Sequence, residues 1–310
     1  MMFEKKHSSV FIYHPGVAHA LRFGLPVVSL ESTVVTHGLP RPENLELARL
    51  LETTVRREKV VPATIGLMDG KVHIGLSDEE LQRLANENGV RKVSRRDYGI
   101  ALARGESGGT TVAGTLIASR QAGIRVFATG GIGGVHRNAP FDVSADLPEL
   151  SRSPLIVVCA GAKSILDLPA TVEVLETLGV AIVGYQTDEF PAFYSRNSGL
   201  RVDVRIETPL EAAEIARAQW QMGLENALLV VQPPPVDVAL PAEEIEQLIL
   251  AALKEADQKK ISGAAVTPFL LSRVSQMSGG ASLRANLALL ENNARLAAQI
   301  AAVLQPMQVV

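Results

Sequence analysis

The sequence predicts a three-layer α/β/α fold with a largely parallel, mixed central sheet. Short apolar runs alternate with helix-like patterns along the whole chain, as they do in consecutive strand–helix–strand units. Hydrophobic residues make up 47% of the 310 residues and charged residues only 20%, which is enough apolar material for a large buried core. Because neither a composition shift nor an internal repeat marks a boundary, we expect residues 1–310 to form one domain, with residues 1–10 as a flexible tail.

Composition also excludes several classes of function. A net charge of -3 and the lack of any block of like charge argue against a nucleic-acid-binding surface. The longest apolar runs have the length of strands, so we expect no membrane span. The chain has one cysteine, Cys159, and therefore no intramolecular disulfide. This cysteine usage and a polar, charged N-terminus that does not resemble a signal peptide favour a cytoplasmic location.

The first half of the chain contains the clearest local signals. Asp69 and Gly70 form a hairpin turn, and Ser77 followed by three acidic residues reads as the N-cap of a helix. We expect a loop over residues 37–42, because a glycine and two prolines cannot continue a strand. Strands are expected over residues 26–30, 60–68, 72–76 and 126–128, and helices over residues 14–23, 44–58 and 77–86 and in a segment that ends at Gln121.

The second half repeats this alternation. Three prolines at residues 233–235 force an extended segment. The last helix is rich in alanine and leucine but carries Asn286, Asn292 and Asn293, whose amides would contact other helices or a ligand. Strands are expected over residues 155–160, 181–185 and 227–232, and helices over residues 209–222, 243–257, from 267 onward and 284–303.

Lys163 occupies the position around which the chain is organised. It follows the apolar strand expected at residues 155–160 and precedes a helix expected to begin near Ser164 and run through residues 170–178. Open α/β sheets bind ligands at such strand-to-helix junctions. Apolar neighbours favour the neutral amine of a lysine, which can form a Schiff base with a carbonyl-type carbon. The alternative is a solvated lysine on a surface loop.

Two further stretches are suited to an anion. Residues 92–97 are strongly charged and begin with Lys92, although they also fit a polar edge strand. Residues 108–115 form a turn of small residues leading into a helix, where free N–H groups and the helix dipole favour phosphate. The glycine-rich residues 129–136 do not form a dinucleotide site, because His136 replaces the third glycine and no helix pattern follows.

Residues 141–147 carry two carboxylates, Asp142 and Asp146, with Ser144 between them. Oxygen ligands of this kind suit Mg²⁺ or Mn²⁺. The alternative is a helix N-cap with solvated aspartates.

Together these stretches carry a family resemblance. SLEST (residues 29–33), KVSRRD (92–97), GGTTV (108–112), FATGGIGGVH (127–136), FDVSADL (141–147), CAGAKSILD (159–167), TPFLL (267–271) and NLALLENN (286–293) resemble, in the same order, the signature blocks of the pseudouridine-5'-phosphate glycosidase family. The resemblance departs from the family pattern at the loop of residues 135–141, which is a few residues shorter.

The resemblance implies reversible cleavage of the C–C glycosidic bond of pseudouridine 5'-phosphate to uracil and ribose 5-phosphate. It implies a divalent metal, typically Mn²⁺, a homotrimer, Lys163 as the imine-forming nucleophile and Glu31 as the proton donor. Asp142 falls on the metal-ligating position. The remaining implied residues contact the substrate or supply polar groups to the site: Lys92, Val112, Thr129, His136, Ser144, Ala145, Asp146 and Asn286.

These residue types agree with the chemistry. A C-glycoside offers no heteroatom leaving group, so the usual pair of carboxylates is not sufficient, whereas an iminium at C1' can accept the electron demand. Two other functions remain open. One is an aldolase or lyase that acts on a sugar phosphate through Lys163, and it would release no uracil. The other is a non-catalytic sugar-phosphate-binding protein, which would tolerate Lys163→Met.

Overall fold

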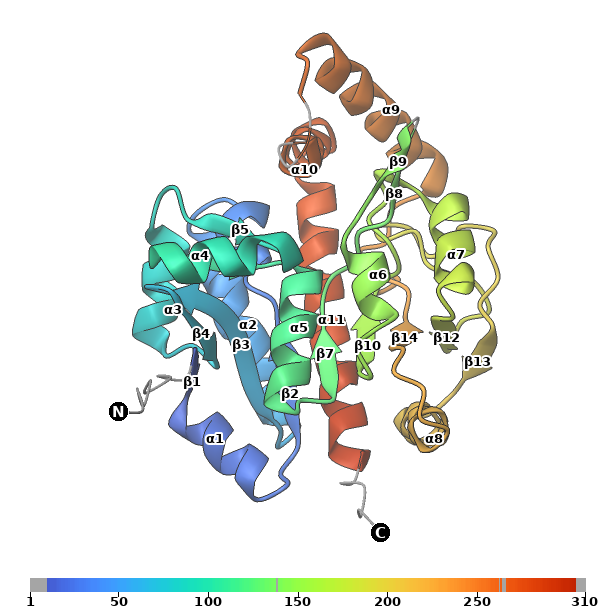
Figure 1. Cartoon of the computed structure of the whole chain (residues 1–310). Helices are drawn as coiled ribbons and strands as arrows, with labels where there is room; N and C mark the ends of the chain where they lie inside the picture. The colour runs from blue at the N-terminus through green and yellow to red at the C-terminus, as the bar shows by residue number, and fades with distance from the viewer. Residues whose placement is uncertain (1–9, 138, 262, 264–265, 305–310) are drawn as a thin grey trace.

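The computed structural model of the protein describes residues 10–137, 139–261, 263 and 266–304 (Figure 1). Except for Val10, the tail expected over residues 1–10 lies outside the described residues. Helices cover both faces of a twisted central sheet, which confirms the predicted three-layer α/β/α fold. Among the described residues, no helix combines the length and the apolar character that crossing a membrane requires.

The central sheet is mixed but mostly parallel. Its path runs β1-β4-β3-β2-β7-β10-β14-β12-β13, and β6 pairs with β3 and carries β5. Neighbouring strands are parallel except where β4 and β6 pair with β3. The strands are β1 (Phe11–Tyr13), β2 (Val27–Leu30), β3 (Val61–Met68), β4 (Lys71–Ile74), β5 (Arg91–Val93), β6 (Gly108–Thr110), β7 (Val126–Ala128), β10 (Ile156–Cys159), β12 (Ala181–Tyr185), β13 (Val204–Ile206) and β14 (Leu228–Val231).

A second, smaller sheet stands at one end of the central one. It joins β8 (Val135–His136) to β9 (Ala139–Val143) on one side and to β11 (Leu166–Asp167) on the other, with antiparallel pairing throughout. Because β11 follows Lys163 closely, this small sheet fixes the chain on the far side of that residue.

The helices form the two outer layers. In Figure 1, α5 lies in front of the sheet, where it packs on β2 and β3, and α11 lies behind it, where it packs on β7, β10 and β2. The helices are α1 (Pro15–Arg22), α2 (Glu43–Arg57), α3 (Asp78–Asn86), α4 (Tyr98–Arg104), α5 (Val112–Ala122), α6 (Asp146–Leu150), α7 (Leu168–Thr177), α8 (Pro209–Gln221), α9 (Ala242–Gln258), α10 (Val266–Met277) and α11 (Ala281–Val303), with a π-helical turn η1 (Val34–Gly38) and a 3₁₀ turn η2 (Arg95–Asp97).

The apolar runs in the sequence become buried strands because both faces of the sheet are covered. All four residues of β10 and all four of β14 are fully shielded from solvent, as expected for parallel strands with helices on both sides. Local signals hold as well. Ser77 forms a capping box with Glu80 at the start of α3, and β3 and β4 form the predicted hairpin at Asp69 and Gly70.

Three expected elements differ in the structure. The helix after Lys163 begins at Leu168 and not near Ser164, because residues 166–167 pair in β11 and Asp167 caps α7 by accepting from the Ala170 N–H at 3.0 Å. Residues 108–110 form a strand rather than a turn, held by pairing with β3 and β5. The loop expected at residues 37–42 starts inside the π-helical turn η1. The hydrophobic periodicity of the sequence does not reveal a turn of this kind.

Candidate active site

Three adjacent parallel strands deliver their chain ends to one edge of the sheet. Leu30 of β2 is in register with Ala128 of β7, and Val158 of β10 is in register with the same alanine. Glu31 follows β2 directly, and Lys163 comes shortly after β10. Carboxyl ends of parallel strands meet at the same edge, so residues distant in sequence become neighbours there.

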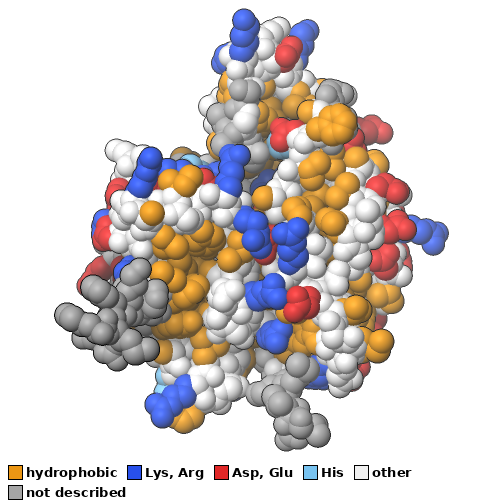
Figure 2. All heavy atoms as spheres, viewed as in Figure 1, with side chains coloured by type: hydrophobic (Ala, Val, Ile, Leu, Met, Phe, Trp, Pro, Cys, Tyr) orange, Lys and Arg blue, Asp and Glu red, His pale blue; other side chains and the backbone are white. Residues whose placement is uncertain are grey.

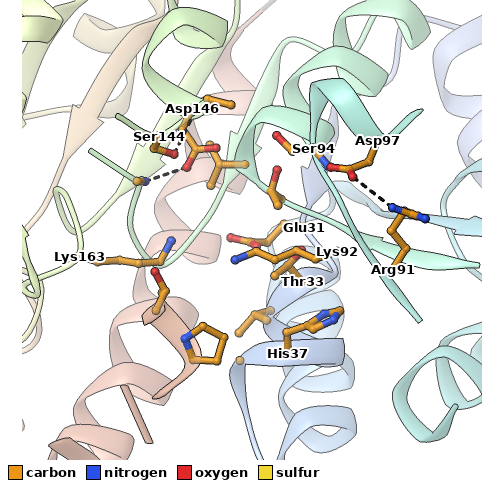
Figure 3. A pocket seen from close by; sticks show the side chains of 18 of the residues that line it. Glu31, Thr33, His37, Arg91, Lys92, Ser94, Asp97, Ser144, Asp146 and Lys163 are labelled. Atoms are coloured by element: carbon orange, nitrogen blue, oxygen red, sulfur yellow. Dashed lines mark hydrogen bonds and ion pairs between the residues drawn. The ribbon is translucent and has the colours of Figure 1, made fainter. Parts of the chain in front are cut away.

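A cavity of about 1190 Å³ opens at this edge. The central sheet, the small sheet and helices α10 and α11 all contribute to its wall. In Figure 3 the Lys163 amine approaches from one side, and the Glu31 carboxylate and Lys92 amine lie opposite it. Sequence prediction and structure agree on ten lining residues, which are Glu31, Lys92, Val112, His136, Asp142, Ser144, Ala145, Asp146, Lys163 and Asn286.

Glu31 is a partly buried carboxylate beside two lysines. Burial raises the pKa of Glu31, and the Lys163 charge opposes this increase. The Thr129 hydroxyl, which donates to a carboxylate oxygen of Glu31, opposes it too. A carboxyl group with a raised pKa can remain protonated close to neutral pH and act as a general acid.

Thr129 differs from the other predicted site residues. It is buried and does not line the cavity in the described structure, since its hydroxyl is directed to Glu31. The Asn293 side chain on α11 donates to the backbone oxygens of Thr129 at 2.8 Å and Gly130 at 3.3 Å. The geometry therefore gives Thr129 a contact with the predicted proton donor, and direct substrate contact stays a prediction.

The Lys163 backbone is held from both sides. Its N–H donates to the Ile132 oxygen at 3.1 Å, and its own oxygen accepts from the Leu166 N–H at 3.0 Å. Gly161, two residues earlier, has φ of 82°, and a Cβ there would meet the Pro191 oxygen at 2.2 Å. Only glycine fits this close approach, so the path of the chain into Lys163 depends on it.

Lys92 supplies a second amine from the edge strand β5. Desolvation lowers the pKa of Lys92, and the nearby Lys163 charge lowers it further. Asp146 and Glu31 act in the opposite direction. Two amines and two carboxylates therefore share one partly desolvated space, where each charge affects the others strongly.

Arginines next to Lys92 differ in whether they are paired. Arg95 is held by the buried carboxylate of Glu149 at 2.6 Å. Arg96 is exposed at the cavity wall and has no ion pair among the described residues. Arg96 is thus a cation that the sequence pattern contained but did not single out.

Asp146 is anchored by backbone groups. One carboxylate oxygen accepts from the Ala113 N–H at 2.9 Å, in the first turn of α5, and the other accepts from the Gly133 N–H at 2.8 Å. A Cβ on Gly133 would lie 2.2 Å from the Ser144 hydroxyl oxygen and 2.7 Å from Asp146. The glycine-rich stretch therefore forms a cradle for Ser144 and Asp146, and not a nucleotide-binding turn.

Asp142 lies on β9 as an exposed residue of the cavity wall. Within the described residues, no group of three or more histidine, cysteine or acidic side chains could surround a metal ion. Because both oxygens of Asp146 already accept backbone hydrogen bonds, Asp142 is the freer carboxylate. This donor set fits a Mg²⁺- or Mn²⁺-type ion that keeps most of its waters and is bound by one carboxylate and the substrate.

His37 and Phe193 are among the lining residues that were not singled out from the sequence. His37 lies in η1, and its Nδ1 is 2.6 Å from the Thr36 hydroxyl oxygen. Burial lowers the pKa of His37, and the Lys92 charge adds to that effect. Phe193 has a positive φ of 63° and packs beside Gly131. The only sequence signal for His37 was its place in the loop predicted over residues 37–42.

The chain is similar to known proteins over most of its length. A family model described as indigoidine synthase A like protein matches residues 16–303. The chain belongs to this family. A pseudouridine-5'-phosphate glycosidase of Solibacter usitatus is 52% identical, with 94% of this chain and 98% of the relative covered. One of Caldanaerobacter subterraneus is 50% identical over 92% of this chain and 94% of the relative.

Two solved structures share the fold of this chain. The indigoidine synthase A-like protein of Thermotoga maritima has a TM-score of 0.88 and 42% identity, with 97% of this chain and 99% of that chain covered. The prealnumycin C-glycosynthase AlnA, solved in complex with ribulose 5-phosphate, has a TM-score of 0.88 and 40% identity, with 95% and 96% covered. That neighbour therefore binds a pentose phosphate on the same fold.

Proposed function

We propose that the protein is a pseudouridine-5'-phosphate glycosidase, which reversibly cleaves the C–C glycosidic bond to give uracil and ribose 5-phosphate. The observation that carries the proposal is the convergence of Lys163, Glu31 and Lys92 in one cavity. Relatives of about 50% identity bear this name over nearly their whole length. AlnA, named for making a C-glycoside, adds support for C–C bond chemistry at a pentose phosphate.

The residues suggest a sequence of steps. Glu31 donates its proton to the ring oxygen as the C1'–O4' bond breaks, and the Lys163 amine forms a bond to C1' and loses a proton. Protonation of uracil C5 then accompanies rupture of the C1'–C5 bond, while the nitrogen lone pair forms the iminium. Water adds to the iminium carbon, and the C–N bond breaks to release ribose 5-phosphate and the free lysine.

Other residues act by binding and orientation. We assign the 5'-phosphate to Lys92 and to Val112 at the start of α5, both of which line the cavity, and the binding energy of this group can orient C1' toward Lys163. Ser144, Ala145 and Asp146 line the cavity, and Figure 3 shows Ser144 and Asp146 across from Lys92. We assign the sugar hydroxyls to this side of the cavity, because the Asp146 carboxylate is rigidly held and can accept hydrogen bonds.

We further propose that Asp142 holds a divalent cation, Mn²⁺ by preference. When bound, such an ion would polarise substrate oxygens and help to fix their position. Chelation by EDTA should abolish uracil release, and Mn²⁺ should restore it. If the Asp142→Ala variant released uracil at the wild-type rate in the presence of EDTA, the assignment of Asp142 as the metal ligand would be overturned.

We also propose that the protein is a homotrimer and that it is located in the cytoplasm. Phe141, next to Asp142 on β9, is 99% exposed, and another copy of the chain would shield this large apolar side chain from water. Cys159 is buried as a free thiol, which fits a reducing compartment. Light scattering on the purified protein tests the trimer directly, and a monomeric mass would reject it.

The deciding experiment is an assay of the purified protein with pseudouridine 5'-phosphate, with and without Mn²⁺. Uracil and ribose 5-phosphate should appear in equal amounts. An aldolase or lyase that uses Lys163 would release no uracil, and a pure binding protein would bind the compound without turnover. Either result would reject the glycosidase function.

A further inference from the structure

Arg137 lies just outside the cavity and contacts the turn that carries Lys163. Its Nε donates to the Leu166 oxygen at 3.1 Å, and one terminal nitrogen donates to the Ser164 oxygen at 2.9 Å. The Ser164 carbonyl lies between Lys163 and β11, and the Leu166 carbonyl belongs to the first residue of β11. Arg137 does not line the cavity, so its contacts are to the chain behind the site.

The same guanidinium is held from the other side by a carboxylate. Glu246, on α9, accepts from two terminal nitrogens of Arg137 at 2.5 and 2.9 Å. The Arg137 side chain is only 20% exposed, and Glu246 is 43% exposed. A bidentate pair of this kind fixes the plane of the guanidinium, and thereby the direction of its remaining donors.

Besides the backbone bonds of Lys163 and the pairing of β11 with β8, this turn is held by the Arg137 side chain. The Ser164 hydroxyl is buried without a hydrogen-bond partner among the described residues. The Ser164 and Leu166 carbonyls meet Arg137, while the backbone groups of Lys163 bond to Ile132 and Leu166. The guanidinium therefore connects the turn after Lys163 to a separate helix.

We propose that Arg137 is a positioning residue that keeps the turn after Lys163 in the conformation that directs its amine into the cavity. Glu246 fixes Arg137 and so links this turn to α9. Since α9 packs against α10, and Thr267 and Leu271 of α10 line the cavity, the link connects the lysine to the part of the wall that α10 contributes. The inference concerns the placement of Lys163 and rests on the proposed function only for the effect on imine formation.

The first test needs no turnover. Trinitrobenzenesulfonate labelling, followed by peptide mass spectrometry, measures the rates at which Lys163 and Lys92 react in the wild type and in Arg137→Ala. We expect Lys163 labelling to rise severalfold relative to Lys92, because the turn loosens and releases the amine. Equal rates in the two proteins, a slower Lys163, or parallel changes in both lysines would overturn the proposal.

The second test measures catalysis with matched variants. Arg137→Ala should slow borohydride trapping of ribose 5-phosphate on Lys163 by roughly ten- to a hundred-fold, while affinity for that sugar phosphate is kept. Millimolar guanidinium should restore part of the rate, which a simple loss of folding would not allow. Arg137→Lys should trap the sugar phosphate little faster than Arg137→Ala, because a single ammonium group cannot replace the planar guanidinium with its several N–H donors.

Two controls separate the possible causes. Glu246→Gln keeps the Arg137 contacts to the turn and should show a smaller loss than Arg137→Ala. Arg205→Ala removes an exposed arginine that also pairs with two carboxylates, Asp188 and Glu207, far from the cavity wall, and should behave as wild type. If the wild type releases no uracil, the glycosidase function is rejected. The positioning role still holds in that case if Lys163 reacts faster in Arg137→Ala than in the wild type. Loss in Arg205→Ala equal to that in Arg137→Ala would overturn the positioning role.

Discussion

Lys163 and Glu31 are separated by more than a hundred residues, yet each follows a strand of the same parallel trio. Their roles are distinct because their surroundings differ. Glu31 receives a hydrogen bond from Thr129 and is partly desolvated, whereas Lys163 is placed by a backbone turn. Three predictions test these roles at the scale of single residues.

Lys163 should be the site of covalent attachment. Borohydride added in the presence of ribose 5-phosphate should reduce the imine and add one sugar phosphate to the peptide that contains Lys163, as peptide mass spectrometry can show. Lys163→Arg is the control, since it keeps the charge and cannot form the imine. Labelling at Lys92 in the wild type would move the nucleophile to the other amine of the cavity.

Thr129 should set the pH range over which Glu31 acts. Burial raises the pKa of Glu31, and the Thr129 hydroxyl opposes this by stabilising the carboxylate. A general acid is active while protonated, so the rate falls as pH rises through its pKa. Thr129→Val should raise this pKa further and move the alkaline limb of kcat/KM to higher pH, while Thr129→Ser should not. A limb that shifts to lower pH would contradict the assignment of Glu31 as the acid.

Lys92 should contribute mainly through the phosphate. Charge-assisted contacts to an anion contribute about 1.5–3 kcal/mol. Lys92→Ala should therefore lose roughly ten- to a hundred-fold in kcat/KM on pseudouridine 5'-phosphate. Unphosphorylated pseudouridine serves as the control substrate and should be nearly unaffected. Equal losses on both compounds would instead place Lys92 at the base or at the reacting carbon.

At the scale of elements, the sequence predicted most strands and helices because their signals are local. Ser77 predicts a capped helix, and Asp69 with Gly70 predicts a hairpin, and both are present in the structure. The helix start after Lys163 was placed too early because β11 forms by pairing with β8, a contact that no local pattern contains. Long-range pairing competes with local propensity and can override it.

The site was predictable to a similar degree for the same physical reason. A strand end identified Lys163, residue types singled out Lys92 and Asp142, and the family resemblance supplied the role of Glu31. The Arg137 contact to the Lys163 turn could not be predicted, since it depends on how the small sheet approaches α9. Side chains that act through a third element leave no spacing pattern in the sequence.

The loop between β7 and β8 should be sensitive to substitution at Gly133. Gly133→Ala would bring a Cβ within 2.2 Å of the Ser144 hydroxyl oxygen and 2.7 Å of Asp146, so both must move. Displacement of site groups by about 1 Å can cost on the order of 10²-fold in rate. We expect such a loss in kcat/KM for Gly133→Ala.

Gly99→Ala is the matched control for that change. Gly99 lies in α4, and a Cβ there meets no heavy atom within 4 Å. It should retain full activity and gain about 0.5–1 kcal/mol of stability, because glycine is unfavourable inside a helix. Gly133→Ala with normal kcat/KM would show that the cradle around Asp146 is not needed for turnover.

At the scale of the whole molecule, a hydrophobic core of strands and helices supports a polar cavity. Figure 2 shows hydrophobic side chains over parts of one face with charged residues scattered among them. In the cavity, by contrast, Lys92 and Lys163 lie together with acidic side chains that include Glu31 and Asp146. Placing such groups in a partly desolvated space costs folding free energy, which the surrounding core offsets. The structure therefore predicts opposite effects on activity and stability for one substitution.

Glu31→Gln should make the protein less active and more stable. It removes the proton donor, so kcat should fall by about 10²–10⁴-fold. Because burial raises the pKa of Glu31 above its ordinary value of 4.5, folding favours the protonated form. The wild type thus loses stability as pH rises from about 4.5 through the raised pKa, while glutamine does not titrate.

Urea unfolding at a series of pH values measures this difference. The two proteins should have similar stability below pH 4.5, and the variant should gain a lead that grows with pH and levels off above the raised pKa. Glu214→Gln, which changes an exposed glutamate on α8, is the control and should follow the wild type at every pH. A Glu31→Gln protein less stable than the wild type at pH 8 would mean that attraction to Lys163 and Lys92 outweighs desolvation, and that Glu31 is held as a carboxylate unsuited to donate a proton.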